Sequence, residues 1–387
     1  MRVIVCPPGL GMGDDQLTAL DLAAAIRDRG HHVMLYATTG PLMDRAQALG
    51  LDLTLSGPAT RVSAGWAAGL VRLARAWRAD VVHSYGGTGA IGACFGTHGL
   101  LGLPQVVTVD AHQAPRCLPR HLDLIVGSRR QWSEAGHHPR RHLVRPAVDT
   151  PAAEDADPIR ARTRLGLSPE DLVLTCVSQL TTDQDRAAGV IAAIAFVDRL
   201  AQRHPAVLVL AGDGPELLRV RAAARRVNAR HGRRVVHAPG LLADPTVAYA
   251  AADVVLGMGG AVLRGMALGK PAIVLGADGY CAPVTPQTLP ALDWHGFHGT
   301  GDGGEYPLLP LLTELAADPA ERRRRGEWSR ALVQDQHSLR RAGLLLENIY
   351  GNAVGRRSGI AERAGSLARS AAGLGALRGD RARWVAR

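Results

Sequence analysis

The sequence is poor in aromatic residues and almost devoid of lysine. The scarcity of aromatic residues argues against a nucleic-acid-binding protein. Aromatic side chains make up 4% of the 387 residues, and Lys270 is the one lysine among 45 basic residues. Proteins that bind nucleic acids more typically interleave a basic face with aromatic residues. The formal net charge of +10 therefore does not indicate a nucleic-acid partner. The arginine bias, with abundant alanine and glycine, suggests a GC-rich genome.

Grouped cysteines and long apolar runs are missing as well. The five cysteines lie far apart and form no C-x-x-C pair, which argues for reduced thiols in a cytoplasm rather than a disulfide framework or a zinc site. The sequence contains no run of about 18 uninterrupted apolar residues, so no transmembrane helix is expected. The N-terminus reads as a strand and a turn, without the regions of a secretory signal. We therefore expect a cytoplasmic protein.

The length and the patterning predict two α/β domains. A chain of this size can build two cores, and strand and helix signals alternate in two series, as in parallel sheets covered by helices. The proline-rich, acidic stretch 149–158 (DTPAAEDADP) is interpreted as a linker. The predicted parts are a first domain over 1–150, a second over 151–336, a last helix over 337–351, and a basic, weakly ordered tail over 352–387. A helix over 361–377 is the alternative within the tail.

The most informative stretch is 249–276, YAAADVVLGMGGAVLRGMALGKPAIVLG. It predicts a strand, a turn containing Gly257, Gly259 and Gly260, a helix stopped by Gly269, and a second strand. A glycine turn that opens a helix presents unpaired N–H groups and the positive end of the helix dipole. This segment therefore predicts an anion site, most often one for phosphate.

A second glycine loop, containing Gly11 and Gly13, follows the first predicted strand and also opens a helix. It indicates either a backbone that a ligand approaches closely or a tight turn without a ligand. Asp14 occupies the position where G-x-G-x-x-G requires its last glycine, and no G-x-x-x-x-G-K-[ST] occurs. The loop is therefore neither a dinucleotide fingerprint nor a P-loop.

Polar residues lie in or after two further strands of the first domain. His83 lies in a strand that leads to a glycine turn, and it is either a cleft residue or a hydrogen-bonded structural histidine. Asp110 follows a strand and is either a base or hydroxyl acceptor, or an N-cap or turn residue. His112 comes two residues later.

In their order and spacing these segments resemble the GT-B-fold retaining glycosyltransferases of the group 1 type. The stretch around Gly259 is similar to the pattern G-x-G-x-x-x-L-E-A-M-A-x-G-K-P, and the segments 80–87 and 210–216 are similar to two further family patterns. The resemblance implies two Rossmann-like domains that face a central cleft. The first domain would hold the acceptor, the second would bind a nucleotide-sugar donor, and the last helix would cross back to the first domain.

The resemblance also implies roles for particular residues. The residues expected to be catalytic are Asp110, His112 and His83. The residues expected to bind the donor are Gly11, Gly13, Gln179, Arg186, Gly240, Leu241, Gly259, Gly260, Ala261 and Arg264. No metal and no cofactor beyond the nucleoside-diphosphate sugar are expected.

Three positions depart from the family pattern together: Gln179 replaces an Arg, Arg264 replaces a Glu, and Asp110 replaces a His. A carboxylate can accept hydroxyl hydrogens from a ribose, whereas a guanidinium can only donate, so Arg264 would prefer a phosphate or a carboxylate. Arg264 could supply the phosphate charge lost at Gln179, the donor could carry an extra anionic group, or the fold could have lost transferase activity.

The resulting expectation is a metal-independent, configuration-retaining glycosyltransferase that acts on a small-molecule acceptor, with natural-product biosynthesis as one setting. The alternatives are sugar phosphorylase or epimerase chemistry, an unusual phosphorylated donor, or a silent binding partner. The tail, with eight arginines against two acidic residues, is interpreted as a solvated end, with membrane contact as the less favoured alternative. The sequence leaves the oligomeric state open.

Overall fold

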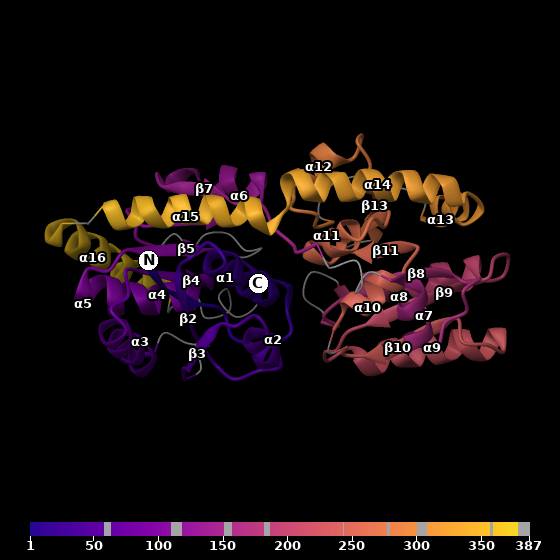
Figure 1. The fold of residues 1–387 in the computed structure, drawn as a ribbon, viewed down its shortest axis with the longest axis horizontal. Coiled ribbons are helices and arrows are strands. Elements are labelled where there is room, and N and C mark those ends of the chain that lie inside the picture. The colour runs from indigo at the N-terminus through magenta and orange to yellow at the C-terminus, as the bar shows by residue number, and fades with distance from the viewer. Residues whose placement is uncertain are drawn as a thin grey trace. The chain divides into compact units, whose positions relative to one another are not determined.

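The computed structural model describes residues 1–57, 63–109, 118–150, 157–181, 186–242, 244–276, 279–299, 308–356 and 359–377. The chain divides into two compact units (Figure 1). Unit 1 contains Met1–Pro146 and Leu339–Arg387, and unit 2 contains Ala147–Ser338. Each unit is built on a mainly parallel sheet, so the predicted α/β architecture with two Rossmann-like regions is confirmed.

The sheet of unit 1 is entirely parallel, in the order β3-β2-β1-β4-β5-β6-β7. Its strands are β1 (Arg2–Cys6), β2 (His32–Ala37), β3 (Asp52–Leu55), β4 (Val81–Tyr85), β5 (Gln105–Thr108), β6 (Asp123–Val126) and β7 (Arg141–Leu143). Its helices are α1 (Asp14–Arg27), α2 (Met43–Ala48), α3 (Ala64–Ala76), α4 (Gly86–Ala93), the π-helix η1 (Cys94–His98), α5 (Gly99–Leu101), α6 (Arg129–Glu134), the 3-10 helix η2 (Ala135–His137), α15 (Leu339–Gly355) and α16 (Ile360–Leu377).

The sheet of unit 2 has the order β10-β9-β8-β11-β12-β13, and only its last strand runs antiparallel. Its strands are β8 (Leu172–Val177), β9 (Ala206–Ala211), β10 (Val236–Gly240), β11 (Val254–Gly257), β12 (Ala272–Leu275) and β13 (Cys281–Pro283). Its helices are α7 (Pro158–Leu165), α8 (Arg186–Leu200), α9 (Leu217–His231), α10 (Thr246–Ala251), α11 (Gly260–Ala267), α12 (Leu289–Trp294), α13 (Leu308–Ala317) and α14 (Pro319–Gln336).

Both faces of the unit 2 sheet are buried, as side-chain alternation along its strands requires. In β8, Leu172 and Leu174 enter the core cluster shared with α8, α9 and α13. Val173 points to the opposite face and joins the cluster under α7 and α10. Parallel strands covered on both faces are continuously apolar, which is why the sequence reveals them clearly.

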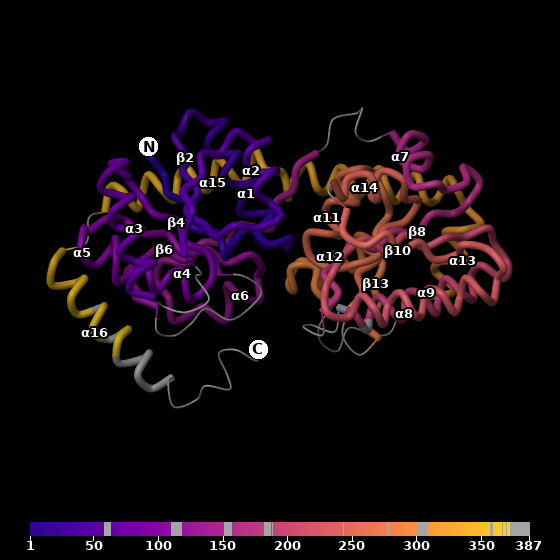
Figure 2. The backbone as a smooth tube through the Cα atoms, turned by 90° about the horizontal axis from the view of Figure 1, so that it is seen from below, coloured from indigo at the N-terminus to yellow at the C-terminus, as the bar shows by residue number. Residues whose placement is uncertain are grey.

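The C-terminal segment belongs to unit 1. Helix α15 packs against α1, β4 and β5. The tail contains α16, which forms over Ile360–Leu377 and lies beside α5 (Figure 2). Leu367 packs against a buried cluster of unit 1, and Ser370 is buried. These two residues anchor the helix to unit 1.

Four of the five cysteines lie in the described part of the chain, and all four are buried; Cys6, Cys176 and Cys281 are free thiols. Burial raises the pKa of the Cys176 and Cys281 thiols to about 12, so both are neutral at physiological pH. None of the described helices is both long and apolar enough to cross a membrane.

Candidate functional site

The unit 2 sheet has a switch point between β8 and β11. From β8 the chain continues to β9 and β10 on one side, whereas β11 and β12 lie on the other. Loops that leave a parallel sheet in opposite directions at such a point make room for a ligand beyond the carboxyl ends of the strands. The loops after β8 and β11 are therefore the strongest candidates for a ligand site within this unit.

The loop after β11 is the predicted glycine turn. Gly259 has φ +57° and ψ −134°, a conformation that glycine adopts without a steric penalty. Helix α11 begins at the next residue, Gly260, and carries no acidic residue in its first turn. No acidic side chain in the first turn of α11 therefore offsets the positive potential of the helix N-terminus, and this potential favours an anion.

Phe297 supports this turn, and the sequence does not predict its role. Its carbonyl accepts the N–H of Gly259 at 2.8 Å. Phe297 is fully buried and has φ +62°, which is unusual for a bulky residue. Its ring lies edge-on to His337, with 5.4 Å between the ring centroids. In the sequence, Phe297 stands out only as one of three phenylalanines.

The loop after β8 holds Gln179 beside a close backbone approach. The Leu180 N–H donates to the Asp213 carbonyl at 2.9 Å. A Cβ on Gly212, whose φ is +155°, would lie 1.8 Å from the Ser178 carbonyl oxygen. Glycine at 212 thus lets the turn after β9 close onto the segment that carries Gln179. Backbone contacts of its neighbours Ser178 and Leu180 therefore hold Gln179 at the carboxyl edge of the sheet.

Arg264 lies on the less buried side of α11. Ala261, Arg264 and Leu268 form a stripe at helical spacing, whereas most other residues of the helix are buried. Ala261, Leu268 and Val177 all pack against the same small cluster, formed by Tyr249, Ala252 and Val255. Val177 ends β8 and is followed by Ser178 and Gln179. The stripe that carries Arg264 is thus turned toward the end of β8.

The other donor residues predicted in unit 2 lie around the same edge. Gly240 ends β10 with φ +88°, and its carbonyl accepts the Gly212 N–H at 2.8 Å. The next residue, Leu241, is 43% exposed. Arg186 begins α8, and the position of its side chain lies outside what the structure describes. Unit 2 thus gathers eight of the ten predicted donor residues at one edge of its sheet.

Gly11 and Gly13 belong to unit 1. Gly11 is exposed, and Gly13 is the N-cap of α1. The first turn of α1 contains Asp14 and Asp15. Two carboxylates at a helix N-terminus favour the helix and disfavour a bound anion. This geometry supports the alternative of a turn without a phosphate, and the donor-binding role of Gly11 and Gly13 stays a prediction.

His83 is sealed inside unit 1. Its Nδ1 lies 2.7 Å from the Tyr350 hydroxyl, and its Nε2 lies 2.7 Å from the Thr108 Oγ1. The side chain is 1% exposed, and burial lowers its pKa to about 3, so the ring is neutral at physiological pH. The structure therefore favours the structural alternative for His83. The two other predicted catalytic residues, Asp110 and His112, lie outside the described residues.

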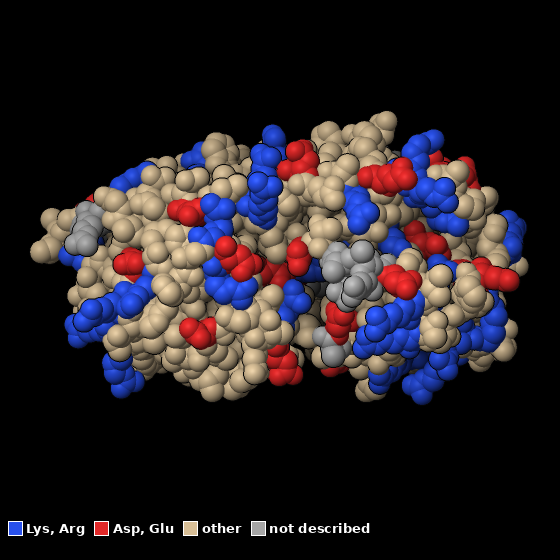
Figure 3. Space-filling model, viewed as in Figure 1, with Lys and Arg blue, Asp and Glu red and all other residues tan. Residues whose placement is uncertain are grey.

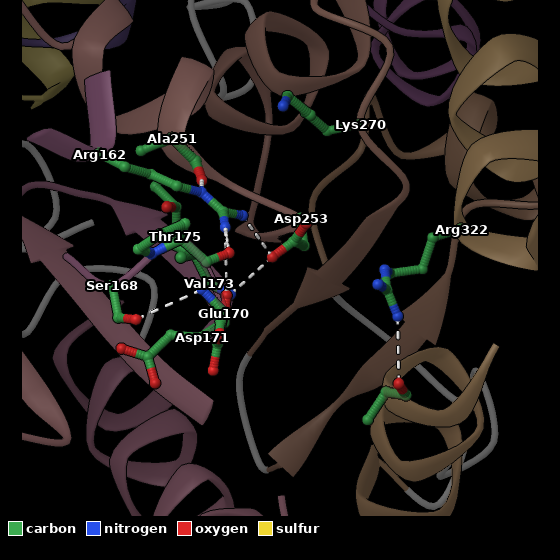
Figure 4. Close-up of polar contacts among 12 residues, drawn as sticks. Arg162, Ser168, Glu170, Asp171, Val173, Thr175, Ala251, Asp253, Lys270 and Arg322 are labelled. Atoms are coloured by element: carbon green, nitrogen blue, oxygen red, sulfur yellow. Dashed lines mark hydrogen bonds and ion pairs between the residues drawn. The ribbon is translucent and has the colours of Figure 1, made fainter. Parts of the chain in front are cut away.

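Lys270, which matches the family pattern, lies at the opposite edge of the unit 2 sheet (Figure 4). It precedes β12, and its Nζ donates to the Ala250 carbonyl at 3.0 Å. Nearby, Arg162 contacts Asp253 Oδ2 at 2.7 Å, and the same oxygen accepts the Val173 N–H at 2.8 Å. Burial lowers the pKa of Lys270 to about 8. This network ties α7 to β8 and β11 and does not belong to the candidate site.

The described residues contain no group of three or more His, Cys, Asp or Glu side chains placed to hold a metal ion. The described part of unit 2 presents a helix start, backbone N–H groups, the Gln179 amide and the Arg264 guanidinium at this edge, and these groups can donate hydrogen bonds to an anion. Two carboxylates also follow β9 at this edge: Asp213 accepts the Gly214 N–H, and Glu216 pairs with Arg219.

Residues 16–146, which lie within unit 1, match the family model for Glycosyltransferase Family 4. A search of curated proteins finds no match to the chain. The match covers less than half of the chain and concerns unit 1, whereas the candidate anion site lies in unit 2.

Several solved structures are similar to nearly the whole chain. A glycosyltransferase from Rickettsia africae is 13% identical, with a TM-score of 0.70 over 92% of this chain and 99% of that one. Anabaena HepE in complex with UDP-glucose is 16% identical, with a TM-score of 0.68 over 91% and 100%. A UDP-N-acetylglucosamine 2-epimerase from Listeria monocytogenes, itself an assigned rather than demonstrated activity, is 13% identical, with a TM-score of 0.60 over 92% and 97%.

At these identities the likeness concerns the fold. The chain has the two-unit α/β fold seen in GT-B glycosyltransferase structures, and residues 16–146 of unit 1 are similar to Glycosyltransferase Family 4.

Proposed function

We propose that the protein is a glycosyltransferase that moves a sugar from a nucleotide-linked donor to a small-molecule acceptor. The observation that carries the proposal is the glycine turn at Gly259, which opens α11 without an acidic residue, at the switch point beside Gln179. A diphosphate is the anion that such a turn suits. The family match in unit 1 and the UDP-glucose complex of HepE support a sugar-nucleotide donor.

In this proposal unit 2 stabilises the leaving group. When the bond between the sugar and the diphosphate breaks, negative charge grows on the phosphate oxygens, and fixed donors aimed at them lower the barrier. The start of α11 and the Arg264 guanidinium supply positive charge, with Arg186 as a further cation. These groups would make a metal unnecessary, so the proposal includes metal-independent transfer. Retention of configuration is part of the proposal because of the resemblance to the retaining family.

The substitution at Arg264 fits the same role. A guanidinium binds phosphate oxygens in a fixed fork and keeps its charge at every physiological pH. With Gln179 neutral, Arg264 on α11 would provide the charge that the loop after β8 lacks, and the ribose would be held elsewhere. A donor with an additional phosphate or carboxylate group is the second form of this proposal.

The acceptor side belongs to unit 1. Asp110 and His112 follow β5 in the sequence, and they remain the proposed catalytic pair. His83 would act on them only indirectly, by fixing Thr108 at the end of β5. A role in cytoplasmic small-molecule biosynthesis completes the proposal.

Isothermal titration calorimetry tests the donor site directly. We expect a nucleoside diphosphate from a panel of UDP, GDP, ADP and TDP to bind, and the matching sugar nucleotide to be consumed when an acceptor is supplied. Binding should not require a divalent cation. If none of the nucleoside diphosphates or their phosphorylated ribose analogues binds, the proposed site is wrong.

A nucleotide-sugar epimerase is the second candidate, because the Listeria protein that bears this name shares the fold over 92% of this chain. Incubation with sugar nucleotide alone separates the two. An epimerase changes the sugar configuration without an acceptor, whereas a transferase leaves the nucleotide sugar largely intact until an acceptor is added. Binding without turnover in either assay would favour a silent binding protein.

A further inference from the structure

Helix α9 of unit 2 carries an exposed arginine-rich face that the proposed function does not use. The segment 217–234 contains seven arginines and no acidic residue. In the space-filling view, basic side chains gather over the part of unit 2 where α9 lies, at the lower right (Figure 3). Five of the arginines are exposed residues of this segment beyond the first turn: Arg225, Arg226, Arg230, Arg233 and Arg234.

The exposed side of α9 has an apolar centre with arginines on both sides of it. Val220, Ala224 and Val227 are buried against the core. The centre of the opposite side is apolar, with Leu218 75% exposed and Ala229 also exposed. At 100° per residue, Arg226 and Arg230 fall on one side of this centre and Arg225 on the other. The exposed face is thus an apolar strip between two rows of guanidinium groups.

Neighbouring carboxylates neutralise only part of this charge. Glu216 pairs with Arg219, Asp198 contacts Arg230 and His231, and Asp171 lies 3.7 Å from Arg233.

Arg226 and Arg234 form no ion pair with the described residues, and Arg225 donates to the Arg221 carbonyl. Helix α14 differs, because its Arg324 and Arg325 both contact Glu321. The α9 face therefore keeps a net positive field.

We propose that the α9 face is a docking surface for an anionic membrane. Clusters of four to eight basic side chains on an amphipathic helix attract anionic lipid headgroups, and an exposed Leu218 between the arginine rows can enter the boundary with the acyl chains. The segment 217–240 contains no aromatic residue on which nucleobases could stack. Charge and the apolar strip thus favour a lipid surface over a nucleic acid.

Vesicle co-sedimentation of the full chain tests the surface. We expect binding to phosphatidylcholine vesicles that contain phosphatidylglycerol, little binding to pure phosphatidylcholine, and loss of binding at high salt. Replacing Arg225→Gln and Arg226→Gln together should weaken binding about 30-fold, given about 1 kcal/mol per basic residue near the surface. Leu218→Ser should cause a smaller loss that salt does not modify.

The matched control replaces Arg323→Gln and Arg330→Gln, two exposed arginines of α14 in the same unit. It removes the same charge and should leave vesicle binding within about twofold. Equal losses for the two double variants would overturn the proposal, because they would show that vesicle binding depends on the net charge of the protein and not on the α9 face. Retention on polyuridylate or polyglutamate, with none on the anionic vesicles, would also overturn it.

Discussion

Units 1 and 2 each open a helix after a glycine N-cap, but the two caps differ in backbone conformation and in charge. Gly13, before α1, is extended with φ −140°, and two carboxylates lie in the first turn of the helix. Gly259, before α11, has φ +57°, and the first turn of that helix carries no acidic residue. Carboxylates at a helix N-terminus satisfy its positive potential from within the helix. The comparison indicates that a glycine loop before a helix suits an anion better where the helix has no carboxylate of its own in its first turn.

The polar side chains predicted for the site also differ between the two units. In unit 1, the buried His83 has partners on both ring nitrogens and is neutral. In unit 2 the candidate edge gathers groups that donate hydrogen bonds, including the always charged Arg264. Unit 1 is therefore expected to respond to pH through buried histidines, and unit 2 to respond to phosphate ligands.

The largest effect should come from Gly212→Ala. The new Cβ would lie 1.8 Å from the Ser178 carbonyl oxygen, on a residue with φ +155°. We expect a loss of more than about 4 kcal/mol in the free energy of unfolding, or a unit 2 that does not fold. Urea unfolding followed by circular dichroism measures it.

The matching substitution in unit 1 is Gly11→Ala, where a Cβ meets nothing within 4 Å and φ is not positive. It should change stability by less than about 0.5 kcal/mol. A comparable loss at both glycines would remove the contrast in backbone packing between the two loops.

Acid should destabilise unit 1 through His83, and His83→Gln should reduce that effect. The ring has a pKa near 3 in the folded protein because it is buried, against about 6.5 when unfolded. Below pH 6.5 the unfolded chain binds a proton that the folded chain cannot. Stability is therefore complete above that pH and falls by about 1.4 kcal/mol per unit toward pH 3.

Thermal unfolding of the variant between pH 7 and 4.5 should show a shallower slope, whatever its stability at neutral pH. The buried His138, with a pKa lowered to about 4, keeps part of the slope. The control His32→Gln changes an exposed ring and should leave the slope unchanged. An unaltered slope in His83→Gln would show that this ring is not kept neutral by the fold.

The sequence predicts the inner strands of both sheets and the edge strand β10, and it misses three other strands. Runs such as 172–177 are apolar except for Thr175, because helices cover both faces of the sheet. The unpredicted strands β3, β7 and β13 are all edge strands. They are three or four residues long, and β13 contains Pro283. An edge strand depends on pairing with its neighbour, which a local pattern does not record.

The candidate site could be predicted where backbone geometry determines it. The turn at Gly259 was recognisable because a glycine before a helix has a local signature. The partners Phe297 and Tyr350 were not predictable, since each meets its partner across a long sequence separation. The charge that Asp14 places at the start of α1 is also not evident from the motif, in which Asp14 only replaces the last glycine of G-x-G-x-x-G.

Reversing the charge at Arg264 should weaken nucleotide binding at least about tenfold. A carboxylate at this position repels a diphosphate and cannot donate to it. Calorimetry with the best nucleoside diphosphate compares Arg264→Glu with the parent. The control Arg330→Glu makes the same change at an exposed site on α14 and should bind normally. Tighter binding by Arg264→Glu would mean that the position contacts the ribose and not a phosphate.

The smallest effect concerns the carboxylates that distinguish α1 from α11. Replacing Asp14→Asn and Asp15→Asn removes two negative charges from the first turn of α1 and should lower the free energy of unfolding by about 1 kcal/mol, less at high salt. Asp28→Asn, at the C-cap of the same helix, removes a charge from the negative end of the dipole, so it should not destabilise the protein beyond the loss of its exposed pair with Arg27. If both changes destabilise equally, the two aspartates act through local contacts and the electrostatic contrast between the two units loses its basis. If only the first does, the N-terminus of α1 is stabilised by its own carboxylates, which the first turn of α11 lacks.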